Sequence, residues 1–178
     1  VLVIQLMQHL TGLLQIMQAR TLRFPHIAFV MLAWLINNKS GLIMAQAFIF
    51  LIPAVASVVA NSINRQQNLI TLNRGRQDGV VEEMAVLSPD GAMAGYVVDC
   101  TERYAVAMSV LNTSFRASGK LADAEYYGSI YWDGLDQNVV ILGELSKYAD
   151  PKPGQEVVTT GFSQYFPADV LIGWVESA

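Results

Sequence analysis

The stretch "NLITLNRGRQDGV" at residues 68–80 carries the pattern that decides the fold. An apolar, β-branched run at 69–72 ends at Asn73. Two glycines, Gly75 and Gly79, come next, and we expect them to need a positive φ or close backbone contacts. This pattern predicts a strand, a tight corner and the start of a second strand. A phosphate-binding loop does not fit, because neither a Lys-Ser or Lys-Thr pair nor a helical pattern follows the second glycine.

The same pattern of strand and turn signals recurs along much of the chain. From residue 57 onward, short β-branched runs alternate with glycine-containing turn signatures, among which "PDG" at 89–91 is the clearest. Proline presets φ for one turn position and glycine accepts a positive φ, so a hairpin is predicted there. No run is followed by a ten-residue helical pattern. The sequence therefore predicts a mainly β protein with antiparallel sandwich or barrel architecture, rather than a parallel α/β sheet.

The charges divide the chain in two. Apolar residues make up 53% of the 178 residues and charged residues only 15%, which is below the usual quarter. Residues 1–77 hold six bases and no acid, whereas residues 78–178 hold the other five bases and all 15 acids, a net charge of −10. This division indicates a membrane-proximal segment followed by an acidic soluble part. The acidic part would repel phosphates, so nucleic-acid binding is not expected.

The apolar N-terminal segment leaves alternatives open. Apolar residues at roughly helical spacing predict an amphipathic helix over 1–20, with polar residues at every turn. Residues 42–60 are long enough to span a membrane, but a buried helix that runs into a strand at Pro53 fits them equally well. A cleavable signal peptide is disfavoured, because the basic residues do not precede a single apolar core.

The sequence predicts no catalytic, cofactor-binding or metal-binding residue. Both histidines lie within the first 26 residues, so a hydrolase built on the β-region would need His26 to fold back beside its nucleophile. Ser163 lies in "TTGFSQYF", which lacks the frame of a nucleophile elbow. Asp133 and Asp136 do not match a calcium loop and are expected to form turns. A single cysteine, Cys100, can form neither an intrachain disulfide nor a cysteine-rich metal site.

Aromatic residues gather in two stretches of the second half, "EYYGSIYWDG" at 125–134 and "GFSQYFP" at 161–167. Most residues of this kind pack in cores or turns. Tyrosine and tryptophan are also enriched in protein–protein interfaces, so some of these side chains are candidates for an exposed binding groove. The candidate partner contacts are Tyr127, Trp132, Phe162, Tyr165 and Phe166.

Five segments, taken in order and spacing, resemble the rod-shape-determining MreC family from about residue 53 to residue 178. They are "VVANSINRQQNLITLNRGRQDGV" (58–80), "MAVLSPDGAMAGYVVD" (84–99), "YAVAMSVLNTSFRASGKL" (104–121), "YYGSIYWDG" (126–134) and "PGQEVVTTGFSQYFPADVLIGWVES" (153–177). The resemblance implies that the glycines of the corner, the hairpin and the ending are structural. These glycines are Gly75, Gly79, Gly91, Gly95, Gly161 and Gly173.

The resemblance also implies a function. Family members are inner-membrane proteins with a periplasmic coiled coil and a C-terminal pair of small β-barrels, and they form homodimers or larger assemblies. They are expected to act as scaffolds rather than enzymes. They connect MreB, MreD and RodZ of the cell-elongation machinery to penicillin-binding protein 2, and so regulate peptidoglycan synthesis and cell shape. No cofactor is implied.

The expected organisation follows from this resemblance. Residues 1–52 form an apolar, helical, membrane-proximal segment, although they lack the acids and the heptad repeat of the family's coiled coil. Residues 53–121 form a first β subdomain, and residues 122–178 form a second that is incomplete at its C-terminal end, which would leave an unpaired edge strand. Two alternatives remain: a polytopic membrane protein with an acidic soluble tail, and a degenerate β-barrel hydrolase.

Overall fold

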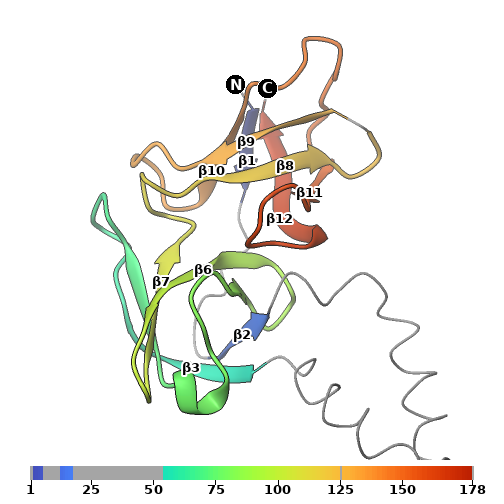
Figure 1. Cartoon of the computed structure of the whole chain (residues 1–178). Helices are drawn as coiled ribbons and strands as arrows, with labels where there is room; N and C mark the ends of the chain where they lie inside the picture. Colours follow the sequence, from blue (N-terminus) through green and yellow to red (C-terminus); the bar gives the residue numbers. More distant parts are fainter. Residues whose placement is uncertain (1, 6–12, 18–53, 125, 178) are drawn as a thin grey trace, which may run out of the picture.

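The computed structural model describes residues 2–5, 13–17, 54–124 and 126–177, and nearly all of their regular structure is β-strand. Figure 1 shows the strands gathered into two barrels that lie against each other. The strands are β1 (Leu2–Gln5), β2 (Leu13–Met17), β3 (Ala54–Asn61), β4 (Leu69–Leu72), β5 (Ala85–Leu87), β6 (Met93–Cys100), β7 (Ala105–Ser109), β8 (Ala117–Leu121), β9 (Tyr127–Tyr131), β10 (Val139–Gly143), β11 (Glu156–Thr160) and β12 (Ala168–Ser177). One short 3₁₀ helix, η2, spans Arg76–Asp78.

The first barrel consists of β2 to β7. Its strands follow one another in the order β2, β3, β4, β7, β6 and β5, and β5 closes back on β2. All neighbouring strands are antiparallel. Inward and outward faces alternate along β4, where Ile70 and Leu72 are fully buried and Leu69 is exposed. This alternation explains why the β-branched run after residue 68 forms a strand.

The second barrel consists of β1 and β8 to β12. Around it the strands follow the order β1, β10, β9, β8, β11 and β12, and β12 closes back on β1. The N-terminal strand thus lies between two strands from the end of the chain, with Ile4 opposite both Val140 and Val175. The predicted mainly β fold of two small antiparallel barrels is confirmed.

The N-terminal prediction was wrong where the structure describes it. Residues 2–5 and 13–17 are strands rather than parts of a helix, and each completes one barrel. The expected unpaired edge of the second barrel is occupied by β1. The physical reason is that open sheet edges carry unsatisfied backbone groups, and a short additional strand satisfies them. In β1 the side chains of Leu2 and Ile4 are buried while Gln5 is exposed.

Two further expectations are corrected. A helix over 42–60 does not fit, because Ala54–Asn61 form β3; the alternative of a strand after Pro53 is the correct one, and residues 42–53 lie outside the described part. The division between the barrels falls between β7 and β8 rather than after residue 121, because β8 pairs with β9 and β11.

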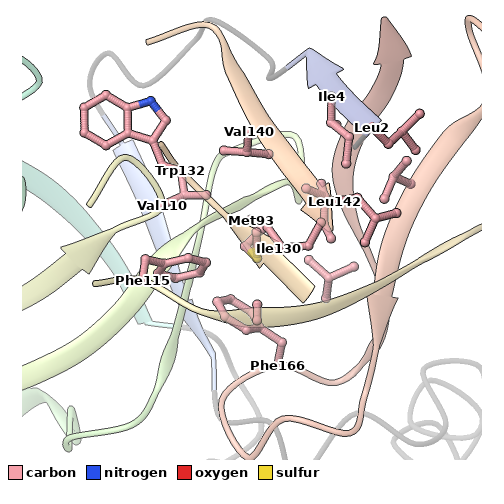
Figure 2. Packing of buried hydrophobic residues seen from close by; sticks show 14 of the residues in the cluster. Leu2, Ile4, Met93, Val110, Phe115, Ile130, Trp132, Val140, Leu142 and Phe166 are labelled. Carbon is pink, nitrogen blue, oxygen red and sulfur yellow. The ribbon is translucent and has the colours of Figure 1, made fainter. Parts of the chain in front are cut away.

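The two barrels share one hydrophobic core. Residues from the first barrel, such as Leu87 and Met93, lie in the same buried cluster as Phe115 of the connecting segment and Ile130 and Phe166 of the second barrel. Figure 2 shows Met93, Phe115, Ile130 and Phe166 converging between the ribbons. A smaller cluster fills the interior of the first barrel alone. Because the shared cluster would be exposed if the barrels separated, the two barrels form one folded unit.

The corner after β4 contains a close backbone approach. Gly75 has an extended backbone, and a Cβ added there would overlap the carbonyl oxygen of Thr101 and lie 2.6 Å from the backbone nitrogen of Tyr104. Gly79 ends η2 with a φ of 83°. The two glycines therefore meet the two predicted requirements separately: close contact at the first and positive φ at the second. Gly91 and Gly161 have positive φ in turns, whereas Gly95 and Gly173 lie within strands against neighbouring backbone.

Candidate binding surfaces on the two barrels

The structure separates the five candidate aromatic contacts. Trp132 and Phe166 are 4% and 1% exposed, so they belong to the core and cannot be contact residues of the folded protein. The indole nitrogen of Trp132 donates to the backbone oxygen of Asp136. Tyr127 and Phe162 are 59% and 72% exposed. They meet edge to face, with ring centroids 5.4 Å apart, so the structure brings together two of the five predicted residues on one surface.

Tyr165 has a structural position between the barrels. Its ring stacks on that of Tyr96 of β6, with centroids 4.0 Å apart and an interplanar angle of 1°. The adjacent Gln164 donates from its side chain to the carboxylate of Glu83 in the first barrel. These contacts join the loop before β12 to the first barrel, so Tyr165 stabilises the packing of the two barrels.

A trough runs across strands β8, β9 and β10 on the outside of the second barrel. Its floor follows from the register, which places Ser118 opposite Ser129 and Ser129 opposite Gly143. Ile130, the sequence neighbour of Ser129, is fully buried, and Ala117, the neighbour of Ser118, is also buried, so the two serine side chains point outward. The middle of the trough is therefore made of small residues.

Larger side chains form the two sides of this trough. Tyr127, two residues before Ser129 on β9, and Phe162, which contacts it, stand on one side. Arg116 stands on the other side, where its guanidinium lies 5.4 Å from the ring centroid of Tyr131. A guanidinium nitrogen of Arg116 also donates to the carbonyl oxygens of Thr113 and Phe115, at 2.8 and 2.6 Å. These contacts hold the guanidinium in place at the side of the trough.

The trough has a volume of about 430 Å³ and is open to solvent. This volume is in the range of small-molecule binding sites. Within the described residues, the hydroxyls of Ser118 and Ser129 have no hydrogen-bond partner, and the carboxylate of Glu144 at the end of β10 makes no ion pair. The polar groups of the trough are thus available to a ligand.

A second surface lies on the hairpin of β3 and β4 in the first barrel. Four large apolar side chains are 40% to 56% exposed along it: Val55, Val59, Ile63 and Leu69. Figure 1 shows this hairpin at the side of the first barrel, in teal. The ladder shifts between Val58 and Ala60, which leaves Val59 as an additional residue on β3. These exposed apolar side chains make the hairpin a candidate surface for protein binding.

Residues that were weighed for chemistry have structural roles. The hydroxyl oxygen of Ser163 accepts hydrogen bonds from the backbone nitrogens of Tyr165 and Phe166, so it is a turn serine. The carboxylates of Asp133 and Asp136 accept from backbone nitrogens two residues on, which confirms them as turn residues. His26 lies outside the described residues. Among the described residues, no His, Cys, Asp or Glu cluster could hold a metal ion.

Two charged pairs, Arg74–Asp78 and Arg76–Glu82, lie at the corner that follows β4. Arg76 donates to the carboxylate of Glu82. A hydrogen bond from its own backbone, together with Arg76, lowers the pKa of Glu82 below its usual value, and Glu82 raises the pKa of Arg76. Both side chains are about half exposed, so water screens this pair and it contributes little to stability.

The serine floor of the trough is not among the residues predicted from the sequence. Ser118 and Ser129 stand in "ASGKL" and "YGSIY", where each serine alternates with residues that face the core. That alternation was the available signal, but the register that brings the two serines together is visible only in the folded barrel. No helix in the described segments has the length and apolar character needed to cross a membrane.

Comparison with known proteins identifies the family. The family model for the barrel core of the rod shape-determining protein MreC matches residues 58–178. The cell shape-determining protein MreC of Listeria monocytogenes is 30% identical over 128 residues, which are 70% of this chain and 43% of that protein. The chain thus spans less than half the length of this curated relative.

Solved structures agree with this match. An MreC structure from Listeria monocytogenes superposes with a TM-score of 0.63 at 25% identity, covering 87% of this chain and 78% of the other. The crystal structure of MreC from Pseudomonas aeruginosa gives a TM-score of 0.64 at 22% identity, over 70% of this chain and 79% of the other, and supports the fold alone. The chain belongs to the MreC family of cell shape-determining proteins.

Proposed function

We propose that this chain is a non-enzymatic scaffold of the bacterial cell-elongation machinery. In this role it would help to form and maintain cell shape and would regulate peptidoglycan synthesis. Membership in the MreC family supports the part in cell shape. The observation that carries the scaffold proposal is the shared core, because it holds the exposed surfaces of two barrels at a fixed distance from each other.

The proposed partners are those that the family resemblance implies. They are penicillin-binding protein 2, MreD, MreB and RodZ, together with further copies of this chain. We place the barrels in the periplasm and the N-terminal part of the chain at the inner membrane. The β3–β4 hairpin is the proposed contact for a protein partner, because its exposed side chains are aliphatic and protein interfaces bury such groups at their centre.

A pull-down with the periplasmic domain of penicillin-binding protein 2 tests this proposal. The full chain is the bait, since a fragment that begins at residue 54 would lack β1 and β2 and leave both barrels open. Leu69→Asp places a charge on the hairpin, and Leu135→Asp places the same charge on an 85% exposed leucine of the second barrel. We expect the first variant to lose the partner and the second to retain it.

Circular dichroism and thermal melting must show that both variants are folded. If the wild-type chain captures no transpeptidase domain, the proposed partnership is wrong. If both aspartate variants bind as well as the wild type, the partnership holds but its location on the β3–β4 hairpin does not.

A further inference from the structure

The trough on the second barrel has a different chemistry from the apolar hairpin. A protein-binding hot spot has an apolar centre that excludes water, surrounded by a polar rim. Here the arrangement is reversed, because the hydroxyls of Ser118 and Ser129 occupy the centre and the aromatic rings of Tyr127 and Phe162 stand at one side. A ligand that fits this surface must be rich in hydrogen-bonding groups along its centre and apolar along one edge.

The polar groups along the trough narrow the class of ligand further. A serine hydroxyl both donates and accepts a hydrogen bond, the guanidinium of Arg116 only donates, and an ionised Glu144 only accepts. A ligand with hydroxyl groups can satisfy all of them, since each of its hydroxyls also donates and accepts. A phosphate chain would be repelled by Glu144 and by the net charge of −4.

The aromatic side of the trough suits a ring with an apolar face. Tyr127 and Phe162 meet at an interplanar angle of 87°, so the ring that presents its edge does not stack on the other ring, and the contact fixes the orientation of both rings. Sugar rings carry C–H groups on one face and hydroxyls around their rim. They therefore combine the two features that the trough requires.

We propose that this trough binds a chain of pyranose sugars. The sugar rings lie across β8, β9 and β10, with C–H faces toward Tyr127 and hydroxyls over Ser118 and Ser129. The identity of the natural sugar chain rests on the proposed function, which would bring the scaffold beside the glycan strands of the cell wall. Through this contact the second barrel would hold the scaffold on its polymer while the first barrel binds protein.

The test uses the full chain and chitohexaose, a linear chain of N-acetylglucosamine, in isothermal titration calorimetry. Tyr127→Ala removes the aromatic side, and Ser129→Leu fills the floor with an apolar group. Tyr148→Ala is the matched control, because Tyr148 is 71% exposed and lies outside the trough. We expect chitohexaose to bind about tenfold more weakly to Tyr127→Ala and to Ser129→Leu, from the energy of one aromatic contact, with no change for Tyr148→Ala.

Melting temperatures near that of the wild type show that the variants are folded. If Ser129→Leu does not fold, Tyr127→Ala alone tests whether the trough binds sugar. The inference is overturned if the wild type binds no chitohexaose at millimolar concentration, or if Tyr127→Ala binds it as well as the wild type. It is also overturned if Tyr148→Ala is weakened equally. The transpeptidase pull-down depends on the β3–β4 hairpin, so a failure of sugar binding with an intact pull-down rejects this inference and leaves the scaffold proposal standing.

Discussion

Replacing Ile4 by alanine tests whether the N-terminal strand is part of the folded second barrel. Ile4 is fully buried in β1, between Val140 of β10 and Val175 of β12. Truncation of a buried isoleucine to alanine costs about 2–5 kcal/mol, from lost burial and the cavity left behind. Because β1 has only four residues, the loss cannot exceed what β1 contributes to the barrel. We therefore expect the lower part of that range, about 2–3 kcal/mol.

Urea unfolding of the full chain measures this loss through the fluorescence of its tryptophans, one of which, Trp174, pairs with Gln5. With a urea dependence of about 1–3 kcal/mol per molar, the midpoint should fall by about 0.7–3 M. Gln5→Ala is the matched control, because this side chain of the same strand is exposed and its loss should cost less than about 0.5 kcal/mol. Equal midpoints for the two variants would show that β1 does not belong to the folded barrel.

Three further predictions follow from buried contacts. Gly75→Val should lower the free energy of unfolding by about 1–3 kcal/mol or more, because the valine side chain would overlap the backbone of the turn after β6. Thermal melting measures this loss, and an unchanged melting temperature would show that the turn can move to accommodate the side chain. Burial, with a smaller contribution from Tyr165, raises the pKa of Tyr96. The folded state therefore retains the Tyr96 proton when the unfolded state has lost it, and the protein loses stability as the pH rises above about 10. Tyr96→Phe should reduce this loss in thermal melts at alkaline pH, and a pH profile identical to that of the wild type would contradict the prediction. Asn68 is fully buried, and its side-chain amide donates to the backbone oxygen of Leu111 at 2.6 Å. Asn68→Ala should therefore lower the free energy of unfolding by about 1–3 kcal/mol, as measured by urea unfolding. No measurable change would show that the amide is dispensable.

The local pattern predicted the β architecture because each of its signals is set by neighbouring residues. The "PDG" turn forms as expected, since Ser88 and Ala92 bond across it and Gly91 has a φ of 82°. The structural roles of Gly75 and Gly79 in the corner after β4 could be predicted because they, too, are set by neighbouring residues. Their requirement for positive φ or backbone contact depends on the chain within and beside the turn.

The membership of the N-terminal strands could not be predicted in this way. The pairing of β1 with β12 joins Val3 to Ser177, and no local preference encodes a contact over that separation. The same holds for the aromatic residues, because Trp132 and Phe162 have similar polar surroundings in the sequence but opposite burial. Burial of an aromatic ring is decided by the shared core, which requires both barrels to be in place.

The closure of the second barrel by its first and last strands also sets how the protein responds to mechanical force. β1 and β12 are antiparallel, and Figure 1 places the start of β1 and the end of β12 beside each other at one end of this pair. A load applied between these two ends would separate β1 from β12 starting at that end of the pair. Their backbone hydrogen bonds would therefore break one after another rather than together. The seam that closes the barrel would therefore be the first part of the wall to open under tension, at a force well below that needed to shear strands within the barrel.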